Sequence, residues 1–140
     1  MEILDFVLRL GVALLAGLVI GFERQWHNKP TGLKTNMLVA TGSAIFVLVS
    51  IMIHAEDSST DVTRIIAQVV TGIGFLGAGV IFREGTSVHG LTSAATVWCS
   101  AAIGCVAATG YFIETLICTV FVIIVNSVIE PLDKWLSSRK

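Results

Sequence analysis

Few residues of this chain carry groups that could do chemistry, and those few lack the spacing of a catalytic or metal site. The three histidines lie far apart and show no ligand spacing. The three cysteines, Cys99, Cys105 and Cys118, fall inside apolar runs at spacings that match no metal pattern, so we expect apolar fillers. No H-E-x-x-H motif, Walker loop, nucleophile elbow or pair of catalytic carboxylates is present. The sequence therefore predicts no enzyme, no bound metal and no cofactor.

One pattern does match a cofactor motif, because residues 72–77, GIGFLG, spell G-x-G-x-x-G. The dinucleotide fingerprint needs a preceding strand, a following helix and an acidic residue about 20 positions on. Here the glycines lie in the middle of an uncharged apolar run, residues 65–82. Helix packing is the better interpretation. The alternative is a local helix break that exposes backbone carbonyls to a cavity, as in transporters.

Two charged pairs stand at the ends of apolar runs, Glu23-Arg24 and Arg83-Glu84. Pairs of this kind can lock two helix ends together, or they can form a recognition surface for a partner. In the last apolar run, Asn126 and Glu130 are four residues apart and lie on one side of the predicted helix. We expect them to anchor that helix at the membrane–water interface.

The elements that must position these residues are membrane-spanning helices. The chain has 140 residues, of which 54% are hydrophobic and 14% are charged, and the charges lie mostly between the apolar runs. We predict one all-α integral membrane domain, residues 1–140, with Pro131 ending the last helix. Its five spans cover about residues 3–22, 36–55, 64–82, 91–108 and 111–129.

The distribution of Lys and Arg predicts the orientation of these spans. One set of connections and the tail are basic, with Arg24, Lys29, Lys34, Arg83, Lys134, Arg139 and Lys140. The opposite set has only Arg9 and Arg64 among several acidic residues. We therefore expect an N-terminus outside and a cytoplasmic C-terminus.

The third span sorts its residues by size. Projected at about 100° per residue, the small and polar residues share one side and the bulky aliphatic ones the other, apart from Gly77. We expect the slim side to pack against other helices and the bulky side to meet lipid. Gln68 on the slim side is expected to bond a neighbouring helix, with a ligand contact as the alternative. The slim side holds Ala67, Gln68, Thr71, Gly72, Gly74, Ala78 and Gly79, and the fourth span repeats the theme with Ser93, Thr96, Ser100 and Gly104.

Three segments together resemble the MgtC/SapB family. They are GFERQWHNKPTGLKTNMLV at residues 21–39, AQVVTGIGFLGAG at residues 67–79 and VHGLTSAATVW at residues 88–98. The likeness covers about residues 10–110, in order. Lys34 stands where the family usually has Arg. This keeps the positive charge but loses the paired N–H donors with which a guanidinium binds a carboxylate or phosphate. Ser93 stands where a second Thr is common.

The resemblance implies a bacterial inner-membrane protein associated with virulence, with growth under magnesium limitation and with survival in host phagocytes. It implies regulation by binding other membrane proteins, the proton-translocating ATP synthase being one suggested partner, and not magnesium transport. Many relatives continue into a cytoplasmic ACT-like domain, which we expect to be absent here.

From the residues themselves we expect contact with membrane lipid, no nucleic-acid partner and a homo-oligomer, with a dimer favoured. The alternative function is a small oligomeric transporter or channel for an ion such as Mg²⁺, lined by Gln68, Thr71 and the glycines. The residues expected to matter for function or packing are Glu23, Arg24, Thr35, Asn36, Gln68, Gly72, Gly74, Gly77, Gly79, Arg83, Thr92 and Trp98.

Overall fold

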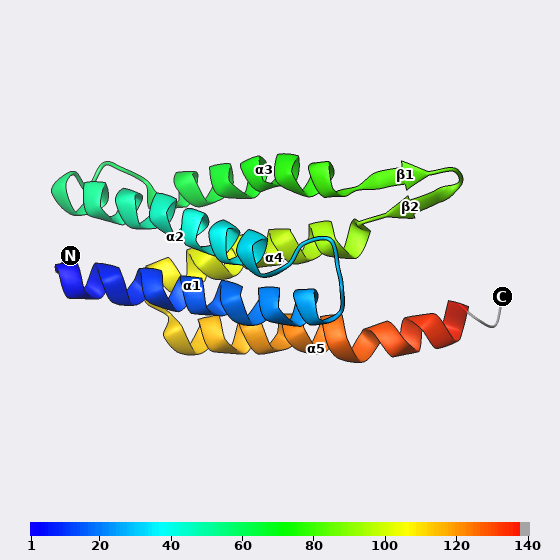
Figure 1. Cartoon of the computed structure of the whole chain (residues 1–140). Helices are drawn as coiled ribbons and strands as arrows, with labels where there is room; N and C mark the ends of the chain where they lie inside the picture. Colours follow the sequence, from blue (N-terminus) through cyan, green and yellow to red (C-terminus); the bar gives the residue numbers. More distant parts are fainter. Residues whose placement is uncertain (138–140) are drawn as a thin grey trace.

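The computed structural model describes the backbone of residues 1–137 and the side chains of residues 1–129. Within that part of the chain, five helices are long and apolar enough to cross a membrane, as predicted. Figure 1 shows the helices side by side, with the N-terminus and the end of α5 at opposite ends of the bundle. The elements are α1 (Ile3–Trp26), α2 (Leu33–Glu56), α3 (Val62–Val80), β1 (Phe82–Glu84), β2 (Ser87–His89), α4 (Leu91–Thr109) and α5 (Phe112–Ser137).

Local chemistry explains where two of these helices, α3 and α4, begin. The Asp61 side chain caps α3 by accepting hydrogen bonds from the Thr63 hydroxyl and the Thr63 backbone N–H, at 2.7 and 2.9 Å. The same two bonds hold the pKa of the Asp61 carboxyl below its usual value. Gly90, with φ +85°, begins α4 at a point where a Cβ atom would meet the carbonyl of Val80.

Helix α4 forms the centre of the bundle and is the most buried of the five spans. Its neighbours approach closely because glycine removes the side chain at the contact. A Cβ atom on Gly104 would meet the backbone carbonyl of Ala40 on α2, and one on Gly17 of α1 would lie 2.6 Å from the Asn36 carbonyl oxygen. The tight backbone-to-backbone contacts therefore join α1, α2 and α4.

The face of α3 that packs against the bundle is the bulky one, so the predicted assignment of its two faces is wrong within this chain. Ile73 is 7% exposed and packs with Val39, Val97 and Ala101 from α2 and α4. Cβ atoms built on Gly72, Gly74 and Gly79 would meet nothing within 4 Å. The physical reason is apolar burial, because the aliphatic side chains of this face fill the contacts with α2 and α4, and Gly77 on the same face lies against Ala94 of α4.

Helix α5 continues through Pro131 to Ser137, so the prediction that Pro131 ends this helix is wrong. Proline removes one backbone donor and crowds the preceding turn, which weakens a helix without always ending it. The membrane-spanning part of α5 is Phe112–Ile129, in agreement with the predicted fifth span. The side chains of Lys134, Arg139 and Lys140, which contribute to the orientation argument, lie outside the described residues.

The connection between α3 and α4 forms an antiparallel hairpin that the sequence analysis did not predict. Phe82 pairs with His89, Arg83 with Val88 and Glu84 with Ser87. The turn includes Gly85 at φ +60°, a value that favours glycine. Strands of three residues are too short for an alternating pattern to show. Figure 1 shows the hairpin projecting beyond α1, α2, α3 and α4 at the end opposite the N-terminus, where α5 extends as well, and we call this the hairpin end.

Candidate functional site

The residues most able to carry function form a buried polar cluster towards the hairpin end. Burying polar and charged groups in an apolar bundle is unfavourable unless they bond one another. All members of the set are less than 9% exposed. The polar cluster comprises Glu23, Arg24, Asn36, Ser93, Thr96, Ser100 and Asn126.

Helix α4 supplies three hydroxyls to the cluster, and each one bonds a different neighbouring helix. Ser93, Thr96 and Ser100 share a face because they are three and four residues apart. Ser93 bonds α1, Thr96 bonds α5 and Ser100 bonds α2. Ser93 and Thr96 lie in the segment that resembles the third family motif and Ser100 follows two residues after it, so this part of α4 bonds three neighbouring helices.

Two adjacent residues at the end of α1 hold two different helices. The Arg24 Nη2 atom donates to the Ser93 hydroxyl on α4 at 2.6 Å, and Arg24 is 1% exposed. The carboxylate of Glu23 accepts from Asn126 Nδ2 and Ser127 Oγ on α5, each at 3.4 Å. The His27 ring, four residues along α1, places Nδ1 3.0 Å from Glu23 Oε1. Of the two predicted roles for Glu23-Arg24, this burial favours the lock between helix ends.

Asn36 ties the start of α2 both to α4 and to the preceding connection. Its Oδ1 atom accepts from the Ser100 hydroxyl at 2.8 Å, and its Nδ2 atom donates to the carbonyls of Thr31 and Gly32 at 3.2 and 2.9 Å. Asn36 and Ser100 are both fully buried. One carboxamide therefore fixes the register of α2 against α4 and the path of the α1–α2 connection.

A second arginine of α1 holds the opposite end of α4. The Arg9 Nη1 atom donates to the Ala108 carbonyl at 3.0 Å, and its Nε atom donates to Asp5 Oδ1 at 2.9 Å. The same number of residues separates Arg9 from Arg24 on α1 and Ser93 from Ala108 on α4. Helices α1 and α4 run antiparallel and have the same rise per residue. When Arg24 lies beside the first turn of α4, Arg9 therefore lies beside its last turn.

The structure brings together only some of the predicted site residues. Glu23, Arg24 and Asn36 join the polar cluster, whereas Thr35 and Thr92 are exposed at the same end. Arg83 lies in the exposed hairpin, where its Nε atom donates to the Gly85 carbonyl at 2.8 Å. The remaining residues belong to α3 and α4. On α3, Gln68, Gly72, Gly74 and Gly79 are exposed and Gly77 packs near Ala94, whereas Trp98 on α4 is 47% exposed and lines a pocket between α3 and α4.

Helix α5 contributes Asn126 to this site, a role that the sequence did not predict. Asn126 is 7% exposed, and it accepts from the Thr96 hydroxyl at 3.2 Å while it bonds Glu23. The prediction of an interfacial anchor at Asn126 is therefore wrong. The sequence did contain a signal for this role, because an asparagine within an apolar run needs a hydrogen-bond partner inside the bundle. In the part of the chain that the structure describes, no three potential ligands gather to hold a metal ion.

Five apolar spans, four of which share a buried polar cluster, define a multi-pass integral membrane protein. The chain belongs to the MgtC family, whose model matches residues 10–135.

Relatives of known sequence support this assignment over most of the chain. The chain is 50% identical to the protein MgtC of Brucella abortus over 123 residues and to that of Salmonella typhimurium over 126 residues. These matches cover 88% and 90% of the chain but 50% and 53% of the relatives. An uncharacterized protein of Synechocystis is 45% identical over 139 residues, 99% of this chain and 58% of that relative. The chain thus spans about half the length of the curated relatives it matches. No solved structure matches it.

Proposed function

We propose that this chain is a regulatory protein of the bacterial inner membrane, virulence-associated and linked to growth at low magnesium and to survival in host phagocytes. It acts by binding other membrane proteins, with the proton-translocating ATP synthase as the first partner to test. Membership of the MgtC family and the five apolar spans support the general class.

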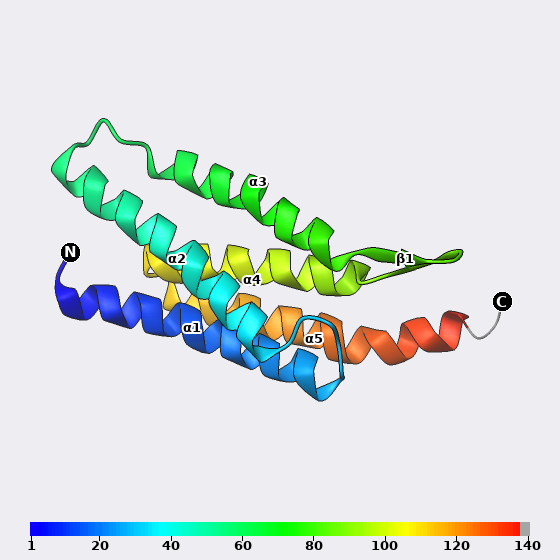
Figure 2. The same cartoon turned by 45° about the horizontal axis from the view of Figure 1, so that its top comes forward.

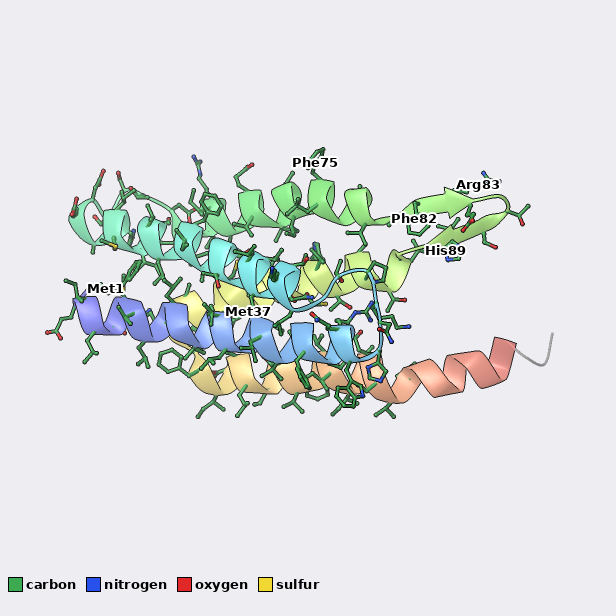
Figure 3. All side chains as sticks on the ribbon, in the orientation of Figure 1. Met1, Met37, Phe75, Phe82, Arg83 and His89 are labelled. Carbon is green, nitrogen blue, oxygen red and sulfur yellow. The ribbon has the colours of Figure 1, made fainter. Side chains whose placement is uncertain are left out.

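The hairpin is the observation that carries the binding part of the proposal. All of its strand residues are exposed, and Phe82 and Val88 are 52% and 51% exposed. Figure 3 shows Phe82, Arg83 and His89 on the hairpin, beyond the ends of α3 and α4. Its strands also leave backbone donors and acceptors unpaired on their outer edges, which suits contact with another protein. The exposure of Arg83-Glu84 supports a recognition surface, in contrast to the buried Glu23-Arg24.

Affinity purification from native membranes at low magnesium, followed by mass spectrometry, tests this function. The double variant Arg83→Ala/Glu84→Ala removes the hairpin charges and should lose subunits of the ATP synthase that the wild type retains. The matched control is Glu56→Ala/Arg64→Ala, which removes an exposed charge pair at the opposite end of the bundle. Equal recovery of partners by both variants would contradict a role for the hairpin. Absence of ATP synthase from the wild-type sample would contradict the named partner.

One observation favours a second candidate, a small oligomeric transporter or channel for an ion such as Mg²⁺. Gln68, Thr71 and three of the glycines lie on the outside of the single chain, where several copies could enclose a shared pathway. Flux of Mg²⁺ or protons into proteoliposomes distinguishes the two functions. Robust, saturable flux by the purified chain would replace the regulatory proposal with transport.

A further inference from the structure

A lateral groove runs between α2 and α3. Figure 2 shows the two helices running apart from their connection towards the hairpin end. The groove has a volume of about 600 Å³, and its walls are almost entirely apolar. The residues that matter here are Val39, Gly42 and Phe46 from α2 and Gln68, Gly72 and Leu76 from α3.

Both walls of this groove contain a glycine with open space beside it. A Cβ atom on Gly42 or on Gly72 would meet nothing within 4 Å. The glycines of the α1–α2–α4 contacts, by contrast, have neighbouring backbone where a side chain would stand. Gly42 and Gly72 therefore have no packing role within the single chain, and a further element could approach the backbone there.

A large aromatic side chain, Phe75 of α3, lies beside the groove. Phe75 is 83% exposed and points away from the bundle (Figure 3). It lies three residues after Gly72 and four before Gly79, so both glycines flank it on one face. The outer surface of α3 thus presents a protruding ring next to open space.

The groove also holds an amide without a partner. Gln68 lines the groove and is exposed, and its side chain makes no hydrogen bond with the described part of the chain. In hydrocarbon such an amide lacks the hydrogen bonds that water would give it, and lipid acyl chains offer neither a donor nor an acceptor. A carboxamide carries both groups, so a second carboxamide can satisfy it with two mutual hydrogen bonds.

We propose that α3 of a second copy of this chain occupies the groove, which forms a two-fold symmetric dimer. A two-fold interface uses the same patch on both partners, so protrusion and recess must lie on one surface. The patch meets that condition, because Phe75 lies beside the groove that would receive the same residue from the other copy. Gln68 of each copy bonds its equivalent across the axis. This interface is separate from the hairpin and does not depend on the proposed function.

Cysteine cross-linking in native membranes tests the position of the interface. The background replaces Cys99, Cys105 and Cys118 with Ala, and single cysteines are then introduced as Gly72→Cys or Gly79→Cys. The control, Phe121→Cys, lies on α5, where the wild-type residue is 64% exposed. Under mild oxidation, the two α3 variants should form a covalent dimer of this chain, and the control should not. Equal cross-linking at all three positions, capture of only a different protein, or no cross-linked dimer at α3 would each overturn the proposal.

A second experiment keeps the proposal falsifiable without relying on oxidation. Gly42→Leu fills the groove and should weaken dimerisation by about tenfold or more, measured by energy transfer between labelled copies in phospholipid vesicles. Gly11→Leu is the matched control, because a Cβ atom on Gly11 of α1 would also meet nothing within 4 Å and Gly11 lies away from the groove. Gln68→Leu should weaken the dimer as well, although it makes α3 more apolar. Wild-type energy transfer in Gly42→Leu and Gln68→Leu would overturn the proposal, as would an equal loss in Gly11→Leu.

Discussion

At the scale of single residues, Arg24 illustrates how the polar cluster constrains the bundle. Its guanidinium is charged at all physiological pH values and is nearly inaccessible, so its hydrogen-bond partners must come from the protein. The Ser93 hydroxyl is one of them. A charge in this position makes the approach of α1 to α4 specific, because few other arrangements would satisfy it.

Loss of the Ser93 hydroxyl is therefore expected to destabilise the protein. Ser93→Ala removes an acceptor from a buried charged donor and should lower the free energy of unfolding by about 1–3 kcal/mol. Thr92→Ala, at the adjacent exposed position, should change it by much less. Thermal unfolding of both variants in the same mild detergent provides the measurement, and equal unfolding temperatures would contradict the importance of the Arg24–Ser93 bond.

The contact between Asn36 and Ser100 allows a quantitative test of coupling. In a double-mutant cycle with Asn36→Leu and Ser100→Ala, we expect a coupling free energy of about 0.6–2 kcal/mol, the range for hydrogen bonds between membrane helices. The two side chains are fully buried and 2.8 Å apart, so each should depend on the other. Additive effects of the two substitutions on unfolding would mean that this bond contributes nothing measurable.

At the scale of the elements, glycine has two different roles in this bundle. Between α2 and α4 it allows the backbones to touch, whereas on the outer face of α3 it leaves space uncovered. The sequence pattern is similar in the two cases, since both are glycines in apolar runs. Only the neighbours of each glycine decide between the roles.

Alanine substitution separates these two roles. Gly104→Ala places a methyl group against the Ala40 carbonyl and should lower the free energy of unfolding by about 1–3 kcal/mol or more. Gly74→Ala meets nothing within 4 Å and should leave the fold of the single chain intact, with a slight gain in helix propensity. Thermal unfolding checks both variants. A severe loss of stability in Gly74→Ala alone would contradict the packing described here.

At the scale of the whole molecule, the five spans of the described residues predict that the N-terminus and the end of α5 lie on opposite sides of the membrane. The arrangement of the elements agrees with that, because the N-terminus and the hairpin lie at opposite ends of the bundle. Which end faces the cytoplasm depends on the basic residues at the hairpin end, among them Lys29 and Lys34.

Cysteine accessibility in intact cells tests this orientation. In a background without native cysteines, Asp57→Cys should be labelled from outside by an impermeant thiol reagent. Lys29→Cys and Ser138→Cys should be labelled only after permeabilisation. The reverse pattern would overturn the positive-inside argument, and labelling of position 138 from outside together with position 57 would overturn the count of five spans.

The sequence by itself determined the number and extent of the membrane spans, because that signal is local. An apolar run of about 20 residues has few alternatives to a spanning helix. Glu23 and Arg24 could be singled out because they flank such a run, and Asn36 because it lies in a segment that resembles the family. The tertiary structure decided which faces meet. Whether Ile73 or Gly74 faces α4, and whether Asn126 anchors at the interface or bonds Thr96 and Glu23, depends on how far apart the helices stand and how they are rotated. Those quantities arise from contacts among residues distant in the chain, such as Gly104 with Ala40 and Ser100 with Asn36, and no periodicity within a single helix contains them.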